Sequence, residues 1–284
     1  MQQFLSEAIQ SRVTGQGWQW FQTALRAALH PVPEDRLLAY YTAASRKLGR
    51  QALALTDREK EQLQTLDPVL PLDYWGVDEA GRVVLLLSLP DYDGFEDLVL
   101  RCYRLGDSRE QQSWLRGLSL LSGCKSFLET AIDACRTNML PLFEAIACEN
   151  PYPSLYFPEL NFNQMVLKSL FLGVALSRIM GVESRFNPEL SRMADDYVTE
   201  REAAGRSVPA DIWLVLAPRI PAEGLPRVYR YLQHEDLEHR HWAAVGLGYV
   251  YNEGARTALE RQLEVESDPR VAAAIKHSLE RIRL

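Results

Sequence analysis

A short polar row on an otherwise apolar stretch is the part of this chain best suited to chemistry. Asn161, Gln164 and Lys168 follow one another at intervals of three and four residues, so on a helix they share one edge. A helix start presents unpaired N–H groups and partial positive charge, to which a lysine adds a full charge. Such a row could hold a carboxylate or a phosphate. With Tyr152 and Tyr156 as aromatic neighbours, these residues form our predicted ligand-binding site.

A purely structural interpretation of the row stays open. Asn161 or Asn163 would then cap the helix with its side-chain oxygen. Lys168 would cover apolar surface with its aliphatic stem and place its amine in water or on a carboxylate such as Glu144 or Glu159.

The stretch from Pro158 to Gly181 must position the row. Read as a helix, it is apolar on most of its circumference, which is typical of a helix buried inside a protein. Lys168 and Arg178 interrupt the apolar run, so we predict a core helix and not a membrane span. The prolines of Asn150–Pro158 predict an extended segment leading into it.

Most other segments also predict helix, because Leu, Ala, Arg, Glu and Gln dominate over β-branched residues. Thr56 and Glu59 have the spacing of a capping box at the start of one of them. Helices are expected over 2–13, 18–29, 34–48, 56–66, 95–105, 110–121, 125–136, 139–148, 187–204 and 208–217.

The run Gly81–Leu89 is ambiguous, since its five consecutive Val and Leu residues would suit a buried strand. No partner strand is evident nearby. We favour a helix that begins near Val77, is capped by Asp78 and ends at Pro90.

The end of the chain contains an internal repeat. The sequence EHRHWAAV from Glu238 recurs 30 residues later as DPRVAAAI from Asp268, and each copy follows a predicted helix, at 225–232 or 255–263. Two helices in about 30 residues is the period of an α-solenoid, and the pattern resembles HEAT repeats.

We therefore predict an all-α fold: a right-handed, solenoid-like array of helical hairpins with degenerate HEAT-like repeats. Residues 1–205 would form a helical region that includes the buried helix of about 158–181, and residues 206–284 would form the HEAT-like repeats, continuous with the first region as one elongated array.

Composition excludes several function classes. The 284 residues include 38 acidic and 31 basic side chains, a net charge of −7, which argues against a general nucleic-acid surface and against attraction to anionic lipid. The first residues lack the pattern of a secretory signal. The four cysteines lack the close spacing of a zinc site and predict reduced thiols in a cytoplasmic protein. They are Cys102, Cys124, Cys135 and Cys148.

No residue pattern predicts catalysis, a bound metal or a cofactor. His234, His239 and His241 lie among acidic residues, but His239 and His241 do not share a helix face. Metal sites need three or four converging ligands, so we expect no metal here.

Two runs of the sequence resemble the EboA family of metabolite traffic proteins. They are Asn150–Gly181, which contains the phrase FNQMVLK, and Met193–Trp213. The resemblance implies a role beside the enzymes of one bacterial operon, in moving a small-molecule precursor toward the periplasm. It implies no catalytic residues.

The first functional hypothesis is a non-enzymatic binding or adaptor protein with partners from the same operon and a small-molecule metabolite. The alternative is an enzyme or small-molecule carrier that binds an anionic or aromatic ligand at the N-terminal end of the central helix. A third is an oligomerisation module. Neither nucleic acid nor an integral membrane segment is expected.

Overall fold

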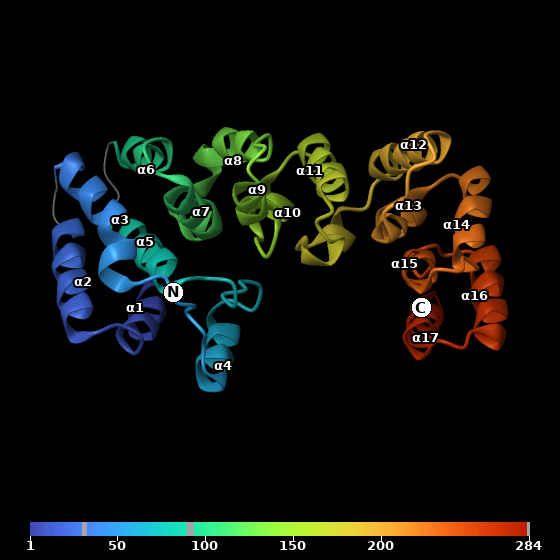
Figure 1. Ribbon diagram of the computed structural model, residues 1–284, viewed down its shortest axis with the longest axis horizontal. Helices are drawn as coiled ribbons and strands as arrows, with labels where there is room; N and C mark the ends of the chain where they lie inside the picture. Colours follow the sequence, from blue (N-terminus) through green and yellow to red (C-terminus); the bar gives the residue numbers. More distant parts are fainter. Residues whose placement is uncertain (30–32, 90–93, 283–284) are drawn as a thin grey trace. The chain divides into compact units, whose positions relative to one another are not determined.

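The computed structural model describes residues 1–29, 33–89 and 94–282, and its regular structure is helical (Figure 1). Within these residues the one β feature is an isolated antiparallel bridge between Ala52 and Gly76. The all-α prediction is confirmed. The chain forms two compact units, Met1–Phe157 and Pro158–Leu284. The division into repeats expected after residue 205 stays a prediction.

The first unit contains the helices α1 to α10. Their bounds are Gln2–Gln10 (α1), Gly15–Ala28 (α2), Glu34–Leu48 (α3), Asp57–Leu66 (α4), Val77–Leu87 (α5), Phe95–Arg104 (α6), Ser108–Gly117 (α7), Leu128–Ala134 (α8), Leu140–Ala147 (α9) and Tyr152–Tyr156 (α10). Thr56 and Glu59 form the predicted capping box before α4.

Helix α5 is the centre of the first unit. Its residues from Val77 to Leu86 are all buried, and α1, α2, α3 and α7 pack around it. A Cβ atom on Gly81 would lie 2.3 Å from a methyl carbon of Leu48, so the missing side chain is what allows α3 to approach so closely. The ambiguous run is therefore helical, as we favoured, although Gly76 and not Asp78 is the N-cap. The expected end at Pro90 lies outside the described residues.

The segment expected to be extended contains the short helix α10. Pro151 is its N-cap and Pro153 lies in its first turn, where the N–H that proline lacks would have had no helical partner. Pro151 and Pro153 therefore do not exclude one turn of helix, because they fall at its start, and Pro158 lies beyond its end.

The second unit contains α11 to α17. Their bounds are Glu159–Leu172 (α11), Pro188–Ala203 (α12), Trp213–Leu216 (α13), Leu225–Leu232 (α14), Leu237–Leu247 (α15), Glu253–Val265 (α16) and Pro269–Ile282 (α17). Short 3-10 turns connect several of them. Every helix in the described part of the chain is too short or too polar to cross a membrane.

The structure corrects the expected extent of the central helix. Helix α11 ends at Leu172 and not at Gly181, because Gly173 adopts a left-handed conformation with φ +73°. It is also not buried all round, since Leu160 is 54% exposed and Phe171 is 71% exposed. Among the described helices, α5 best fits the expected helix that is buried on all sides.

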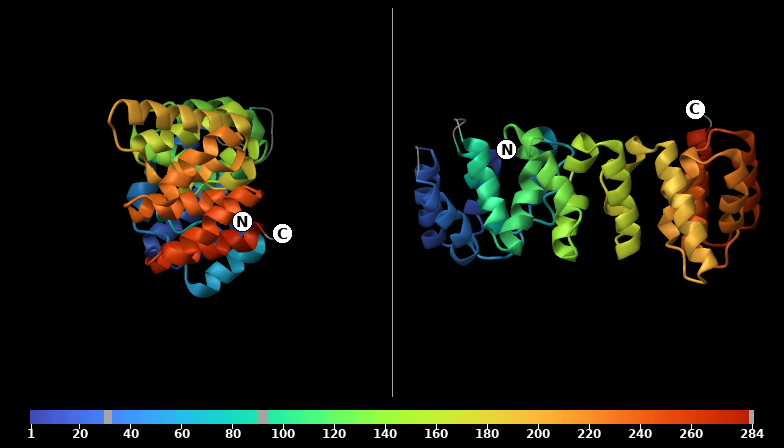
Figure 2. Two further views of the ribbon diagram at one scale, coloured as in Figure 1. Left: turned by 90° about the vertical axis from the view of Figure 1, so that its right-hand side faces the viewer. Right: turned by 90° about the horizontal axis from the view of Figure 1, so that it is seen from above.

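The C-terminal helices pack in two pairs, α14 with α15 and α16 with α17, and α15 also packs on α17. They are the orange and red ribbons at the C-terminal end in Figure 2. The aspartates that cap α15 and α17, Asp236 and Asp268, are 32 residues apart. Buried positions follow the same interval, since Leu247 corresponds to Leu279. The 30-residue match seen in the sequence is therefore out of register by two residues, because it aligned alanine pairs instead of buried positions.

Candidate functional site

Helix α11 has two different faces. One face is buried and the other is partly open. The buried face consists of Phe162, Asn163, Met165, Val166, Ser169 and Leu170. The open face carries Leu160, Gln164, Leu167, Lys168 and Phe171. The predicted polar row thus lies on the open face and not inside the core.

Lys168, the last residue of the row, borders a shallow, mostly apolar cavity of about 570 Å³ between α11 and α12, whereas Asn161 and Gln164 do not line it. Lys168 is half-buried at this cavity, and Gln164 is exposed one turn before it on the same helix face. Asn161 is half-buried. The cavity is lined by Leu167, Lys168 and Phe171 from α11 and by Met193, Asp196 and Tyr197 from α12.

Neither asparagine near the helix start acts as a cap. Helix α11 has Pro158 as its N-cap and makes no side-chain capping bond. Asn163 is buried and forms two reciprocal amide hydrogen bonds with Asn187, of 3.1 and 3.0 Å. Asn187 Oδ1 also accepts the backbone N–H of Leu190, so the same residue caps α12. The amide pair therefore ties the middle of α11 to the start of α12.

The two predicted tyrosines belong to the first unit, whereas the polar row belongs to the second. Tyr152 is buried, its hydroxyl donates to the carbonyl oxygen of Cys124 at 2.7 Å, and burial raises its pKa. Its ring lies 4.8 Å from that of Tyr156, which is half-buried. The Lys125 ammonium is 5.9 Å from the Tyr156 ring. The combined five-residue site stays a prediction.

A buried charge network in the first unit was missed by sequence reasoning. Asp78 and Arg82 lie on α5 with exposures of 0% and 1%, and they pair at 3.0 Å. Arg109 of α7 donates two further hydrogen bonds to Asp78, both of 2.6 Å. Ser45 of α3 donates another, also of 2.6 Å. The spacing of Asp78 and Arg82 inside an apolar run was the available signal.

The guanidinium of Arg82 has its own complete set of partners. It donates to the Tyr41 carbonyl at 3.0 Å, to Ser45 at 2.8 Å and to Ser113 at 3.3 Å, besides Asp78. Burial opposes ionisation of Asp78, but the hydrogen bonds from Arg109 and Ser45 outweigh it and hold the pKa of that carboxyl below its usual value. The network stays ionised and joins α3, α5 and α7.

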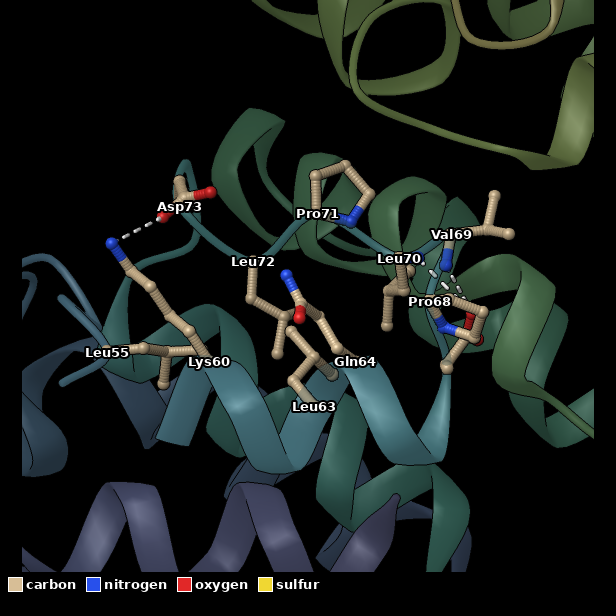
Figure 3. A pocket seen from close by; sticks show the side chains of 11 residues that line it. Leu55, Lys60, Leu63, Gln64, Pro68, Val69, Leu70, Pro71, Leu72 and Asp73 are labelled. Atoms are coloured by element: carbon tan, nitrogen blue, oxygen red, sulfur yellow. Dashed lines mark hydrogen bonds and ion pairs between the residues drawn. The ribbon is translucent and has the colours of Figure 1, made fainter. Parts of the chain in front are cut away.

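A second small cavity lies between α4 and the proline-rich loop that follows it (Figure 3). Its volume is about 190 Å³. Leu63 and Leu72 are buried beside it, and Lys60 reaches Asp73 in an exposed ion pair of 3.8 Å at its rim. Asp67 accepts the backbone N–H groups of two following residues, which shapes the loop.

The histidines of the second unit pack with aromatic rings. His239 Nδ1 accepts the indole N–H of Trp213 at 2.9 Å, and His234 Nδ1 accepts the backbone N–H of Asp236 at 3.0 Å. Burial, together with the neighbouring His234, lowers the pKa of His239. Over the described residues, no three His, Cys, Asp or Glu side chains are grouped as metal ligands.

Comparison with known protein families shows to which family the chain belongs. The family described as "Metabolite traffic protein EboA" matches residues 1–217. The chain belongs to the EboA family. The match covers the first unit, α11, α12 and α13, and it ends before the two C-terminal helix pairs. No curated protein and no solved structure matches the chain.

Proposed function

We propose that this EboA-family protein is a non-enzymatic adaptor that binds a protein encoded in the same operon during the handling of a small-molecule metabolite. The observation that carries the proposal is the open face of α11. Phe171 exposes 71% of its surface at the cavity shared with α12, and Leu160 exposes 54% near the start of the same helix. Exposed apolar patches with polar edges are characteristic of protein interaction sites.

The charges around this face fit a protein partner. Lys168 and Asp196 border the apolar cavity with opposite signs, and Arg192 lies one turn before Asp196 on α12. An apolar centre with a polar rim is the usual anatomy of an interface. The large exposed side chains would supply the contacts that dominate binding energy, since aromatic residues are frequent hot spots.

The helix pairs support a scaffold role in the same way. We infer that they belong to a right-handed, solenoid-like array with HEAT-like repeats, a class of fold that offers long surfaces to partners. We further infer a cytoplasmic adaptor that supports traffic of a biosynthetic precursor toward the periplasm. Fractionation of the native host tests the location: recovery of the protein in the periplasm would contradict it.

Affinity capture from the native host tests the adaptor role. The tagged wild-type protein is expected to recover a protein encoded beside it, and Phe171→Asp is expected to reduce that recovery at least about tenfold, as loss of a hot spot does. Leu105→Asp is the matched control, because Leu105 is 66% exposed but lies in the first unit. Recovery of neither a neighbouring protein nor a metabolite by wild type would overturn the proposal.

A second candidate is a small-molecule carrier or enzyme that uses the polar row. The position of Lys168 on the wall of a mostly apolar cavity favours it, since an anionic or aromatic ligand could contact both. Native mass spectrometry of the purified protein would reveal a co-purified molecule, and Lys168→Ala is expected to lose it. Retention by that variant, with Lys276→Ala as control, would end this hypothesis.

A further inference from the structure

A separate cavity of about 580 Å³ lies in the second unit, where α11, α12 and the link from α13 to α14 meet. Glu159 borders it at the start of α11, residues Pro188 to Asp195 border it from one face of α12, and Arg219 to Pro221 close it from the link. The volume lies within the range of small-molecule sites. The cavity does not include the polar row or Phe171.

Most charges at this cavity neutralise one another. Arg192 bonds both carboxylate oxygens of Glu189, at 2.8 and 2.6 Å, and also bonds Asp196 at 2.5 Å. Asp195 is paired with Arg227. These groups form closed ion pairs.

Two charges at the cavity remain without a partner of opposite sign among the described residues. Arg219 is exposed, and its hydrogen bond goes to the carbonyl oxygen of Pro218 at 3.1 Å. Glu159 is exposed and forms neither an ion pair nor a side-chain hydrogen bond within the described chain. Within the described part of the chain, one cation and one anion without an ion-pair partner thus border the same cavity from different elements.

The residues of the wall that carry no charge are apolar. Pro188, Ile220 and Pro221 contribute carbon surface between the charged groups. Proline and isoleucine walls favour a ligand with an apolar body, because burial of apolar surface drives association. The two unpaired charges then favour a ligand that carries one charge of each sign.

We propose that this cavity binds a small zwitterion with apolar side chains, of the class of hydrophobic amino acids and dipeptides. Its carboxylate is held by the Arg219 guanidinium, which is suited to planar, bidentate recognition of carboxylates. Its ammonium is held by the Glu159 carboxylate. The cavity shares no lining residue with the cavity at Phe171, so either proposal can fail alone.

Calorimetric titration of the full-length protein tests the site with leucine and Leu-Leu as probes. Two single-charge analogues, N-acetyl-leucine and leucinamide, separate the two contacts. We expect binding of at least one zwitterionic probe and at least about tenfold weaker binding of both analogues, since each lacks one charge-assisted contact.

Variants connect the binding to the two named side chains. Arg219→Gln is expected to weaken binding of the zwitterion about tenfold. It should also remove the difference in affinity between the zwitterion and leucinamide. Glu159→Gln should do the same for N-acetyl-leucine. Arg206→Gln is the control, because Arg206 is exposed and pairs with Glu200 away from the cavity. No binding of either probe, or wild-type affinity in both cavity variants, overturns the inference.

Discussion

The two units of the protein bury polar side chains in different ways. The first unit encloses ionised groups, because Asp78, Arg82 and Arg109 form a network between helices. The second unit buries mainly neutral polar residues, because Asn163 pairs with Asn187 and His239 accepts from Trp213. Its ion pair between Arg240 and Glu266 encloses the Glu266 side chain, which is 2% exposed, but leaves that of Arg240 16% exposed. Loss of a partner destabilises a protein strongly when it leaves a buried charge unpaired. The cost is smaller when it leaves a neutral amide without its hydrogen bond. The two cores should therefore differ in their response to the same type of perturbation.

Removal of Asp78 should have the largest effect. Asp78→Ala leaves the Arg82 guanidinium, which is 1% exposed, with neutral partners only. Loss of one member of a buried ion pair costs about 3–5 kcal/mol. Denaturant unfolding measures the loss. Asp133→Ala is the matched control, because its pair with Arg136 is exposed and should contribute about 1 kcal/mol or less. Equal effects of the two variants would contradict the distinction.

Removal of the amide pair should have an intermediate effect. Asn163→Ala leaves one amide hydrogen of Asn187 buried without its acceptor, which costs about 1–3 kcal/mol. Hydrogen exchange should show the loss at α11 and the start of α12, with little change at α5. Gln164→Ala, at the exposed neighbouring position, should leave stability nearly unchanged. Increased exchange at α5 equal to that at α11 would argue against separate cores.

The stability of the two units should depend differently on pH in the acidic range. His239 has a pKa lowered from 6.5 in the folded protein, so stability that is complete above pH 6.5 decreases as the pH falls below that value. One such group changes stability by at most about 1.4 kcal/mol per pH unit. In the first unit, the hydrogen bond from Arg12 lowers the pKa of Glu59 from 4.5 to about 2, so its contribution is lost only below pH 4.5.

Hydrogen exchange between pH 6.5 and 4.5 provides the measurement, after correction for the intrinsic rate. Protection at α13 and α15 should decrease while protection at α4 and α5 persists. His239→Gln should remove part of this pH dependence. The imidazole of His234 and the carboxylate of Asp236 also face His239, and they act on its pKa in opposite directions. Simultaneous loss of protection in both units would contradict the prediction.

The smallest effect should come from the surface contact between the two C-terminal helix pairs. Arg270 of α17 bonds both carboxylate oxygens of Glu238 on α15, and both side chains are about half exposed. Glu238→Gln should cost about 1 kcal/mol or less, and the difference should decrease with added salt. A cost above that of Asn163→Ala, measured by thermal unfolding, would reverse the proposed order.

Local patterns predicted much of the helical structure but not its tertiary pairing. The capping box at Thr56 and the bounds of α3 and α14 depend on residues close in sequence, so they were predictable. The partner of Asp78 at Arg109 was not, because it lies 31 residues away and reaches Asp78 only when α5 packs on α7. The early end of α11 depends on Gly173, whose conformation an apolar pattern does not reveal.

The candidate site was also predictable only where it depends on local sequence. The alignment of Gln164 and Lys168 on one face follows from helix periodicity alone. Whether that face is covered depends on the neighbouring helices, and the structure leaves it partly open. The cavity at Arg219 combines three segments distant in sequence, so no local motif marks it.

Asn187 links the two proposed binding surfaces of the second unit. It fixes the first turn of α12 and, through Asn163, the middle of α11. Those two helices supply both the open face at Phe171 and most of the wall of the cavity at Arg219. A ligand or partner that shifts the start of α12 must therefore change the geometry of the Asn163–Asn187 hydrogen bonds. Those bonds also hold α11, which carries Phe171. Where an occupant of one surface does change affinity at the other, thermodynamic reciprocity requires the effect in the opposite direction to have the same factor.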